Sequence, residues 1–258
     1  MNNNDKKKNF YLITAFVILA SLFLFIFFNG AKKEKDENQE KLPFFLWEPE
    51  KVNPENLLTS YFGNKTDFFS EKKISDLDND GKEEIIVLAS EKEGEVINSF
   101  IFVIGPDEAG NPEVRSYLNI GKSAEDKGFI LSLISNPHFI SLEDLNGDRK
   151  QELILYTGEA GAYISGIGVF IYNNNKLDWA MLEDYKNMVV PAIFQEGASV
   201  RHSLSFKIMT EEKSLAQISG ESDAEENWQW VCQAYQWNGE YFKYGKEVSD
   251  ICYETITK

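Results

Sequence analysis

Cysteine, histidine and basic residues are all scarce in this chain of 258 residues. Two cysteines and two histidines are too few for a multi-cysteine zinc module or a disulfide-dense miniprotein. Lys and Arg number 26 against 42 Asp and Glu, so the formal net charge is −16, which argues against binding the phosphates of nucleic acid. Aromatic residues make up 14% of the chain, which excludes a disordered acidic chain. We therefore expect a packed acidic protein that does not bind nucleic acid.

One long hydrophobic run stands near the N-terminus, between Phe10 and Phe28. At ~1.5 Å per helical residue, it is long enough to cross the roughly 30 Å core of a bilayer. The run ends without the small residues of a signal-peptidase site, so an uncleaved anchor is favoured over a cleaved signal peptide or a buried core helix. We expect residues 1–9 in the cytoplasm, 10–30 as a transmembrane anchor, 31–42 as a charged linker and 43–258 outside the membrane, at the cell surface or in the periplasm.

Two acidic loops lie 68 residues apart in this outer part, and we name them loop A (residues 76–84) and loop B (residues 144–152). Each has carboxylate or amide oxygens at positions one, three and five and a glutamate at position nine, followed by four apolar residues. A strand and a turn then follow at matching distances, at Gly105 and at Asn173. A third hairpin is expected to turn at Asn238-Gly239, and residues 205–209 before it carry no acids. The period predicts three β repeats, at about 70–140, 141–200 and 201–258.

Loops A and B resemble the calcium loops of the FG-GAP and VCBS repeat families, which include the β-propeller of integrin α chains. The resemblance covers roughly residues 70–245, and it implies an all-β, propeller-like array in which each repeat forms one four-stranded blade. Three repeats imply either an open, incomplete propeller or a fourth blade built from residues 44–69 with C-terminal strands. Arg149 departs from the family pattern, because the usual loop glycine is missing there.

The loop residues suit calcium, which takes six to eight hard oxygen ligands at ~2.3–2.6 Å. Alternate residues of a tight loop can turn toward one centre, while the seventh residue offers its main-chain carbonyl. A solvated acidic turn is the alternative for each loop. An EF-hand is excluded, because its twelfth position would be Val87 or Leu155 instead of glutamate. The predicted Ca²⁺ ligands are Asp76, Asp78, Asp80, Lys82 and Glu84 in loop A, and Asp144, Asn146, Asp148, Lys150 and Glu152 in loop B.

Other candidate sites are weaker. The glycine-rich stretch at residues 158–168 leads into an expected strand, so it does not suit a phosphate-binding loop, which opens a helix. His138 and His202 lack a zinc spacing and read as structural or surface residues. The aromatic residues of the C-terminal hairpin fit either a blade core or a sugar-stacking platform. Cys232 and Cys252 form either one disulfide, tying a C-terminal strand to the hairpin, or two buried thiols.

These features predict a membrane-anchored, extracytoplasmic calcium-binding β-repeat module for adhesion or for protein or glycan interaction, with a structural calcium ion. The alternative is an extracellular enzyme, or its accessory subunit, acting on polysaccharide. No catalytic constellation is recognised in the sequence, although glycosidase carboxylates need not be close along the chain.

Overall fold

The computed structural model describes residues 47–62, 69–93, 96–129, 136–159, 164–184, 186–199, 201–223 and 227–257. The expected membrane anchor and linker lie outside these residues. Within them, no helix combines the length and the apolar character needed to cross a membrane. Residues 45–258 form one compact unit, which holds every described element.

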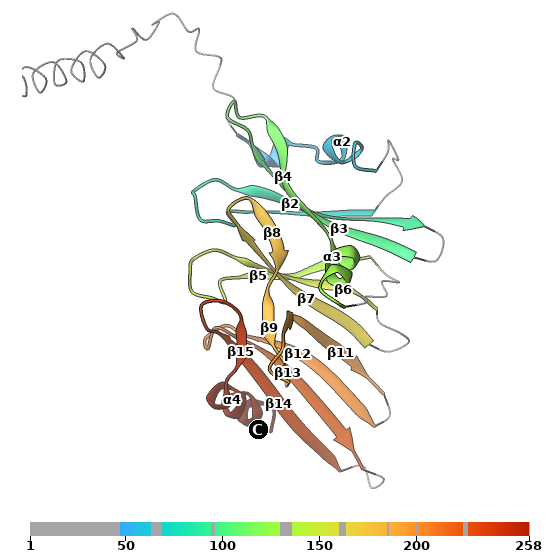
Figure 1. The fold of residues 1–258 in the computed structure, drawn as a ribbon, viewed down its shortest axis with the longest axis vertical. Helices are drawn as coiled ribbons and strands as arrows, with labels where there is room; N and C mark the ends of the chain where they lie inside the picture. The colour runs from blue at the N-terminus through green and yellow to red at the C-terminus, as the bar shows by residue number, and fades with distance from the viewer. Residues whose placement is uncertain are drawn as a thin grey trace, which may run out of the picture. The chain divides into compact units, whose positions relative to one another are not determined.

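The described chain is predominantly β, as expected, and its strands form two mainly antiparallel sheets that stay open (Figure 1). The first sheet has the order β1-β2-β3-β4, with strands β1 (Phe69–Ser75), β2 (Glu84–Glu93), β3 (Val96–Pro106) and β4 (Pro112–Asn119). In the second sheet, β5 (His138–Glu143), β6 (Glu152–Glu159) and β7 (Ile164–Asn173) are neighbours, and β8 (Lys176–Trp179) also pairs with β7.

The second sheet continues from β7 through the C-terminal strands. Its order runs β7-β11-β12-β13-β14-β15-β9-β10, with one parallel pair, β15 with β9. The bounds are β9 (Met181–Glu183), β10 (Val189–Pro191), β11 (Ile193–Ala198), β12 (His202–Met209), β13 (Ser214–Ser222), β14 (Trp228–Trp237) and β15 (Phe242–Tyr244). Three successive four-stranded meanders are therefore present: β1–β4, β5–β8 and β12–β15. Within the described residues, neither strand order returns to its first strand.

Hydrophobic cores lie between successive meanders because the central strands are apolar on both faces. In β2, Ile86 and Leu88 face the second meander, whereas Ile85 and Val87 face the N-terminal segment. The core shared by the first two meanders also contains residues of β6, β7 and β8, and a second core joins β6 and β7 to the third meander. This double burial explains why the strands after loops A and B read as continuous apolar runs.

Short helices flank the meanders: η1 (Pro49–Lys51), α2 (Glu55–Leu58), α3 (Ile120–Asp126) and α4 (Lys246–Thr257). Leu58 and Phe62 cover the outer face of the first meander. At the other end, Val248 and Cys252 of α4 cover the third meander. The chain therefore covers part of each outer face itself, which lessens the need for ring closure.

One expectation is wrong at the C-terminus: the segment around Cys252, predicted as a strand, is helix α4. The apolar residues Val248, Cys252 and Ile256 recur every four residues, which is the period of a helix and was overlooked. The disulfide itself is confirmed: Cys232 of β14 is bonded to Cys252, with 6.0 Å between the Cα atoms. The third hairpin is also present. Its last strand pair is Trp237 with Phe242, so four residues form the loop, whereas an Asn-Gly turn suggests a loop of two.

Candidate metal centre

Loop A connects β1 to β2 and is shaped by its own first side chain. Asp76 accepts hydrogen bonds from the N–H groups of Asp80 (3.1 Å) and Gly81 (2.9 Å). Two loop residues lie in the left-handed region, Asn79 with φ 58° and Gly81 with φ 85°. Gly81 adopts this conformation without a Cβ clash, and asparagine tolerates it better than most residues. The sequence thus encodes a tight turn that folds back on its first acid.

Glu84, the first residue of β2, is the buried member of loop A. Its side chain is fully buried, and Oε2 accepts a hydrogen bond from the Leu77 N–H at 2.9 Å. Its second oxygen, Oε1, has no hydrogen-bond partner among the described residues. Burial, the largest cause, raises the pKa of Glu84 to about 7, and the charges of Asp78 and Asp80 add to the rise. A buried carboxylate oxygen without a partner is costly, so this atom requires an explanation.

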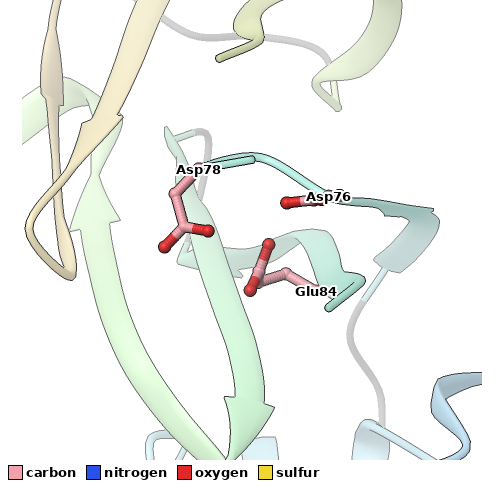
Figure 2. A group of neighbouring side chains, drawn as sticks. All are labelled: Asp76, Asp78 and Glu84. Atoms are coloured by element: carbon pink, nitrogen blue, oxygen red, sulfur yellow. The ribbon is translucent and has the colours of Figure 1, made fainter. Parts of the chain in front are cut away.

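Three carboxylates of loop A converge on one point. Figure 2 shows Asp76, Asp78 and Glu84 directed toward a common space, and one oxygen of each lies within 4.8 Å of the other two. Asp80 is not part of this group; its Oδ1 instead accepts the Lys82 N–H at 2.8 Å. The group offers only oxygen ligands, so it suits a hard cation. The ligand roles of Asp80 and Lys82 stay predictions.

One arginine approaches this group from β4. Arg115 is the extra residue where the β3–β4 register shifts, and such a bulge redirects its side chain. Its Nη1 lies 3.6 Å from Glu84 Oε1, too far for a hydrogen bond, while Nη2 donates to the Pro106 carbonyl at 2.8 Å. A Cβ at Gly105 would collide with the Arg115 side chain, so the glycine leaves its path open. Arg115 therefore offsets part of the negative charge without completing the hydrogen bonding.

Loop B connects β5 to β6 and repeats the backbone of loop A. Gly147 has φ 81° and Arg149 has φ 71°, at the positions of Asn79 and Gly81. Arg149, which stands where the family pattern has a glycine, is therefore strained, because a side chain disfavours the left-handed region. Glu152, like Glu84, is buried and accepts the N–H of the residue after the loop's first acid, here Leu145 at 2.7 Å. Burial again raises its pKa to about 7.

The side chains of loop B, in contrast, satisfy one another. Asn146 Nδ2 donates to Glu152 Oε1 at 2.8 Å, and Asn146 Oδ1 accepts the Asp148 N–H at 2.8 Å. The Lys213 ammonium lies 3.5 Å from Asp144 Oδ2. Lys213 belongs to the β12–β13 turn, which occupies the place of an acidic loop in the third meander. An amide donor and a lysine therefore take positions that a cation would serve in loop A.

Loops A and B are connected directly. The Gln151 N–H donates to the Leu77 carbonyl at 3.1 Å, and the Ser75 hydroxyl donates to Gln151 Oε1. Leu77 also packs in the core between the first two meanders. These contacts link loop A to the residue that precedes β6.

The remaining candidates have structural surroundings. Of the glycine-rich stretch, residues 164–168 belong to β7, as expected for a strand. His138 is exposed and stacks on Tyr156, with 4.3 Å between ring centroids. His202 is exposed on β12. In the aromatic hairpin, Tyr235 and Phe242 are buried in the core, whereas Trp228 and Tyr244 are exposed.

Sequence reasoning missed the contacts that separate the two loops. Arg115 and Lys213 are distant along the chain from the loops they approach, and no local pattern identifies them. The hydrogen bonds of Gln151 to Leu77 and Ser75 connect two meanders, and no local sequence pattern predicts them either. The loop pattern predicts Asn146 as a metal ligand, whereas its amide group donates a hydrogen bond to Glu152.

Comparison of the chain with protein-family models, with curated proteins and with solved structures finds no match.

Proposed function

We propose that residues 45–258 form a calcium-binding β module in which a single ion at loop A has a structural role. The observation that carries this proposal is the buried Glu84 Oε1, which lacks a hydrogen-bond partner beside two further carboxylates. Ligands on opposite sides of Ca²⁺ lie about 5 Å apart, given Ca–O distances of ~2.3–2.6 Å. One oxygen from each of the three carboxylates lies within 4.8 Å of the other two, which is compatible with that size.

Asp76, Asp78 and Glu84 would hold the ion, with Asp80 and the Lys82 carbonyl as further ligands suggested by the loop pattern. The ion supplies two positive charges that oppose the mutual repulsion of these carboxylates. It also gives Glu84 Oε1 a partner, so the start of β2 is fixed to the turn. We expect loop B to keep its shape through the hydrogen bonds of Asn146 and to carry no ion.

The module is proposed to act outside the membrane, in adhesion or in protein or glycan interaction, held by the anchor at residues 10–30. The Cys232–Cys252 disulfide supports an oxidising compartment. Three meanders with cores between them support a relation to the blade repeats of FG-GAP and VCBS proteins, with an incomplete, propeller-like arrangement.

A matched pair of substitutions tests the metal site. Glu84→Gln and Glu152→Gln change equivalent buried carboxylates by the same single atom. In calorimetric titration of residues 45–258, the wild type is expected to bind one Ca²⁺. Glu84→Gln should weaken binding at least tenfold, whereas Glu152→Gln should leave it unchanged. Absence of calcium uptake by metal-free wild-type protein would reject the proposal.

A separate experiment tests the anchor. Full-length protein is expected to fractionate with membranes and to retain its N-terminus, because the hydrophobic run is long and lacks a cleavage site. Intact-mass measurement of a mature protein beginning near Ala31 would contradict the anchor without affecting the metal site.

A further inference from the structure

Strand β14 has one edge that is paired over only part of its length. On one side it pairs with β13 from Trp228 to Gln236. On the other side, β15 pairs only with residues 235–237. The Ala234 N–H donates to Ser249 Oγ (2.9 Å) and its carbonyl accepts the Gly245 N–H (2.9 Å), so the main-chain groups of Ala234 point away from β13.

Main-chain direction alternates along an antiparallel strand, so alternate residues of β14 share the outward direction of Ala234. These residues are Trp228, Trp230 and Cys232, but Cys232 is buried and bonded to Cys252 of α4, so Trp228 and Trp230 are the two that remain. In the part of the chain that the structure describes, no strand pairs with them on that side. Each offers one N–H and one carbonyl, which is the hydrogen-bonding pattern that an added strand requires.

Helix α4 covers this edge at Cys232 and Ala234, but residues 228–231 lack the protection found at two other sheet edges. Edge strand β1 carries Glu71, Lys72 and Lys73, and edge strand β4 begins with Pro112 and has a bulge. Residues 228–233 have no charge and no proline, and their register with β13 is unbroken. Proteins usually block a regular, uncharged edge, because it accepts further strands.

Exposed apolar side chains gather on the same elements. Half of the exposed large hydrophobic residues in the described chain belong to β14, β15 and α4: Trp228, Val231, Tyr244, Ile251 and Tyr253. The Trp228 ring stacks on Trp230 with 5.3 Å between centroids. Such a concentration of aromatic and aliphatic surface is typical of protein-binding sites.

Charge favours one kind of partner. Helix α4 packs against β14 and exposes Glu247, Asp250 and Glu254 against one lysine, Lys246, and Glu221 is exposed on the neighbouring strand. A second copy of this chain would bring a second acidic α4 to the same place. We propose that the outer edge of β14 binds an extended, lysine- or arginine-containing segment of a partner protein as an additional β-strand. This inference gives a partner class to the interaction role proposed above, and it does not depend on the metal.

The test uses a capped six-residue peptide of alternating lysine and valine, titrated into residues 45–258 by calorimetry and tryptophan fluorescence. A peptide with glutamate in place of lysine tests charge, and a peptide N-methylated at alternate amides tests strand pairing. We expect the basic peptide to bind, and the other two to bind at least tenfold more weakly.

Two exposed valines on strands of the same sheet provide matched variants. Val231→Lys places a positive charge on β14, and it should weaken binding of the basic peptide at least fivefold. Val189→Lys makes the same change on β10 and should have no effect; the two valines are 52% and 47% exposed. Circular dichroism and melting of both variants establish that they are folded.

The inference is overturned if the basic peptide does not bind, if the acidic or N-methylated peptide binds equally well, or if both valine variants behave alike. Concentration-dependent dimerisation that Val231→Lys abolishes would also overturn it, because the occupant would then be a second copy. Calcium uptake is measured on the same sample, so a failed metal site and a failed edge are distinguished.

Discussion

Loops A and B have the same backbone but different ways of compensating their buried charge. Both turns use two left-handed residues, and both hold a buried glutamate through the N–H of a core leucine. In loop B the second oxygen of that glutamate is bonded to Asn146, whereas in loop A the equivalent Asp78 has no proton to donate. The motif therefore specifies the turn, and one amide together with one lysine distinguishes the loop whose buried charge is compensated within the chain from the loop whose charge is not.

The largest expected effect comes from exchanging these features. Asn146→Asp combined with Lys213→Met removes the amide donor and the ammonium from loop B, and should raise the calcium stoichiometry of residues 45–258 from one to two. Asp78→Asn should remove the site in loop A, because the new amide can donate to Glu84. Lys243→Met removes a lysine that pairs with Glu183 instead, and serves as the control. An unchanged stoichiometry in the double variant would show that loop B is unsuitable for another reason.

Removal of calcium by a chelator should destabilise mainly the first meander. An ion at a hundredfold excess over Kd stabilises the folded state by ~2.7 kcal/mol, which corresponds to a melting temperature ~5–10 °C higher for a unit of this size. Removing it should increase hydrogen exchange at residues 85–88 more than at residues 153–156, because only the first segment follows an occupied loop. Glu84→Gln should be insensitive to the chelator. A melting transition of the wild type that the chelator does not alter contradicts a structural ion.

The pH dependence of the metal-free protein follows from the raised pKa values of Glu84 and Glu152, both about 7 against an ordinary value of 4.5. A carboxyl with a raised pKa favours the folded state while it is protonated, so its contribution is complete below about pH 4.5 and is lost as the pH rises through 7. In chelator, the melting temperature should fall by a few degrees from pH 5 to pH 8. Each Gln substitution should remove part of that fall, and a wild-type melting temperature that rises over this range contradicts the assignment.

The smallest expected effect concerns Arg115. Its guanidinium is 3.6 Å from Glu84 Oε1 and repels a cation bound there. Arg115→Met should tighten calcium binding roughly tenfold, which is the order expected for one nearby, mostly buried charge. Lys122→Met removes a cation on the surface of α3, and should leave the affinity unchanged. Weaker calcium binding in Arg115→Met would mean that the arginine orients Glu84 for the ion.

The sequence predicted the local features well and the long-range features poorly. The spacing of the acids located both turns, and the apolar runs after Glu84 and Glu152 identified buried strands. Neither pattern contains information on Arg115, whose direction depends on a bulge, or on Lys213, which comes from a turn of another meander. Helix α4 was missed because a strand was expected to continue the hairpin, although the spacing of Val248 and Cys252 fits a helix.

Anomalous diffraction from crystals of residues 45–258 grown with Tb³⁺, a calcium substitute, would locate the ion. We expect one strong anomalous peak, bounded by Asp76, Asp78 and Glu84, with no peak at loop B. A peak at loop B alone, or the absence of a peak at loop A, would contradict this expectation.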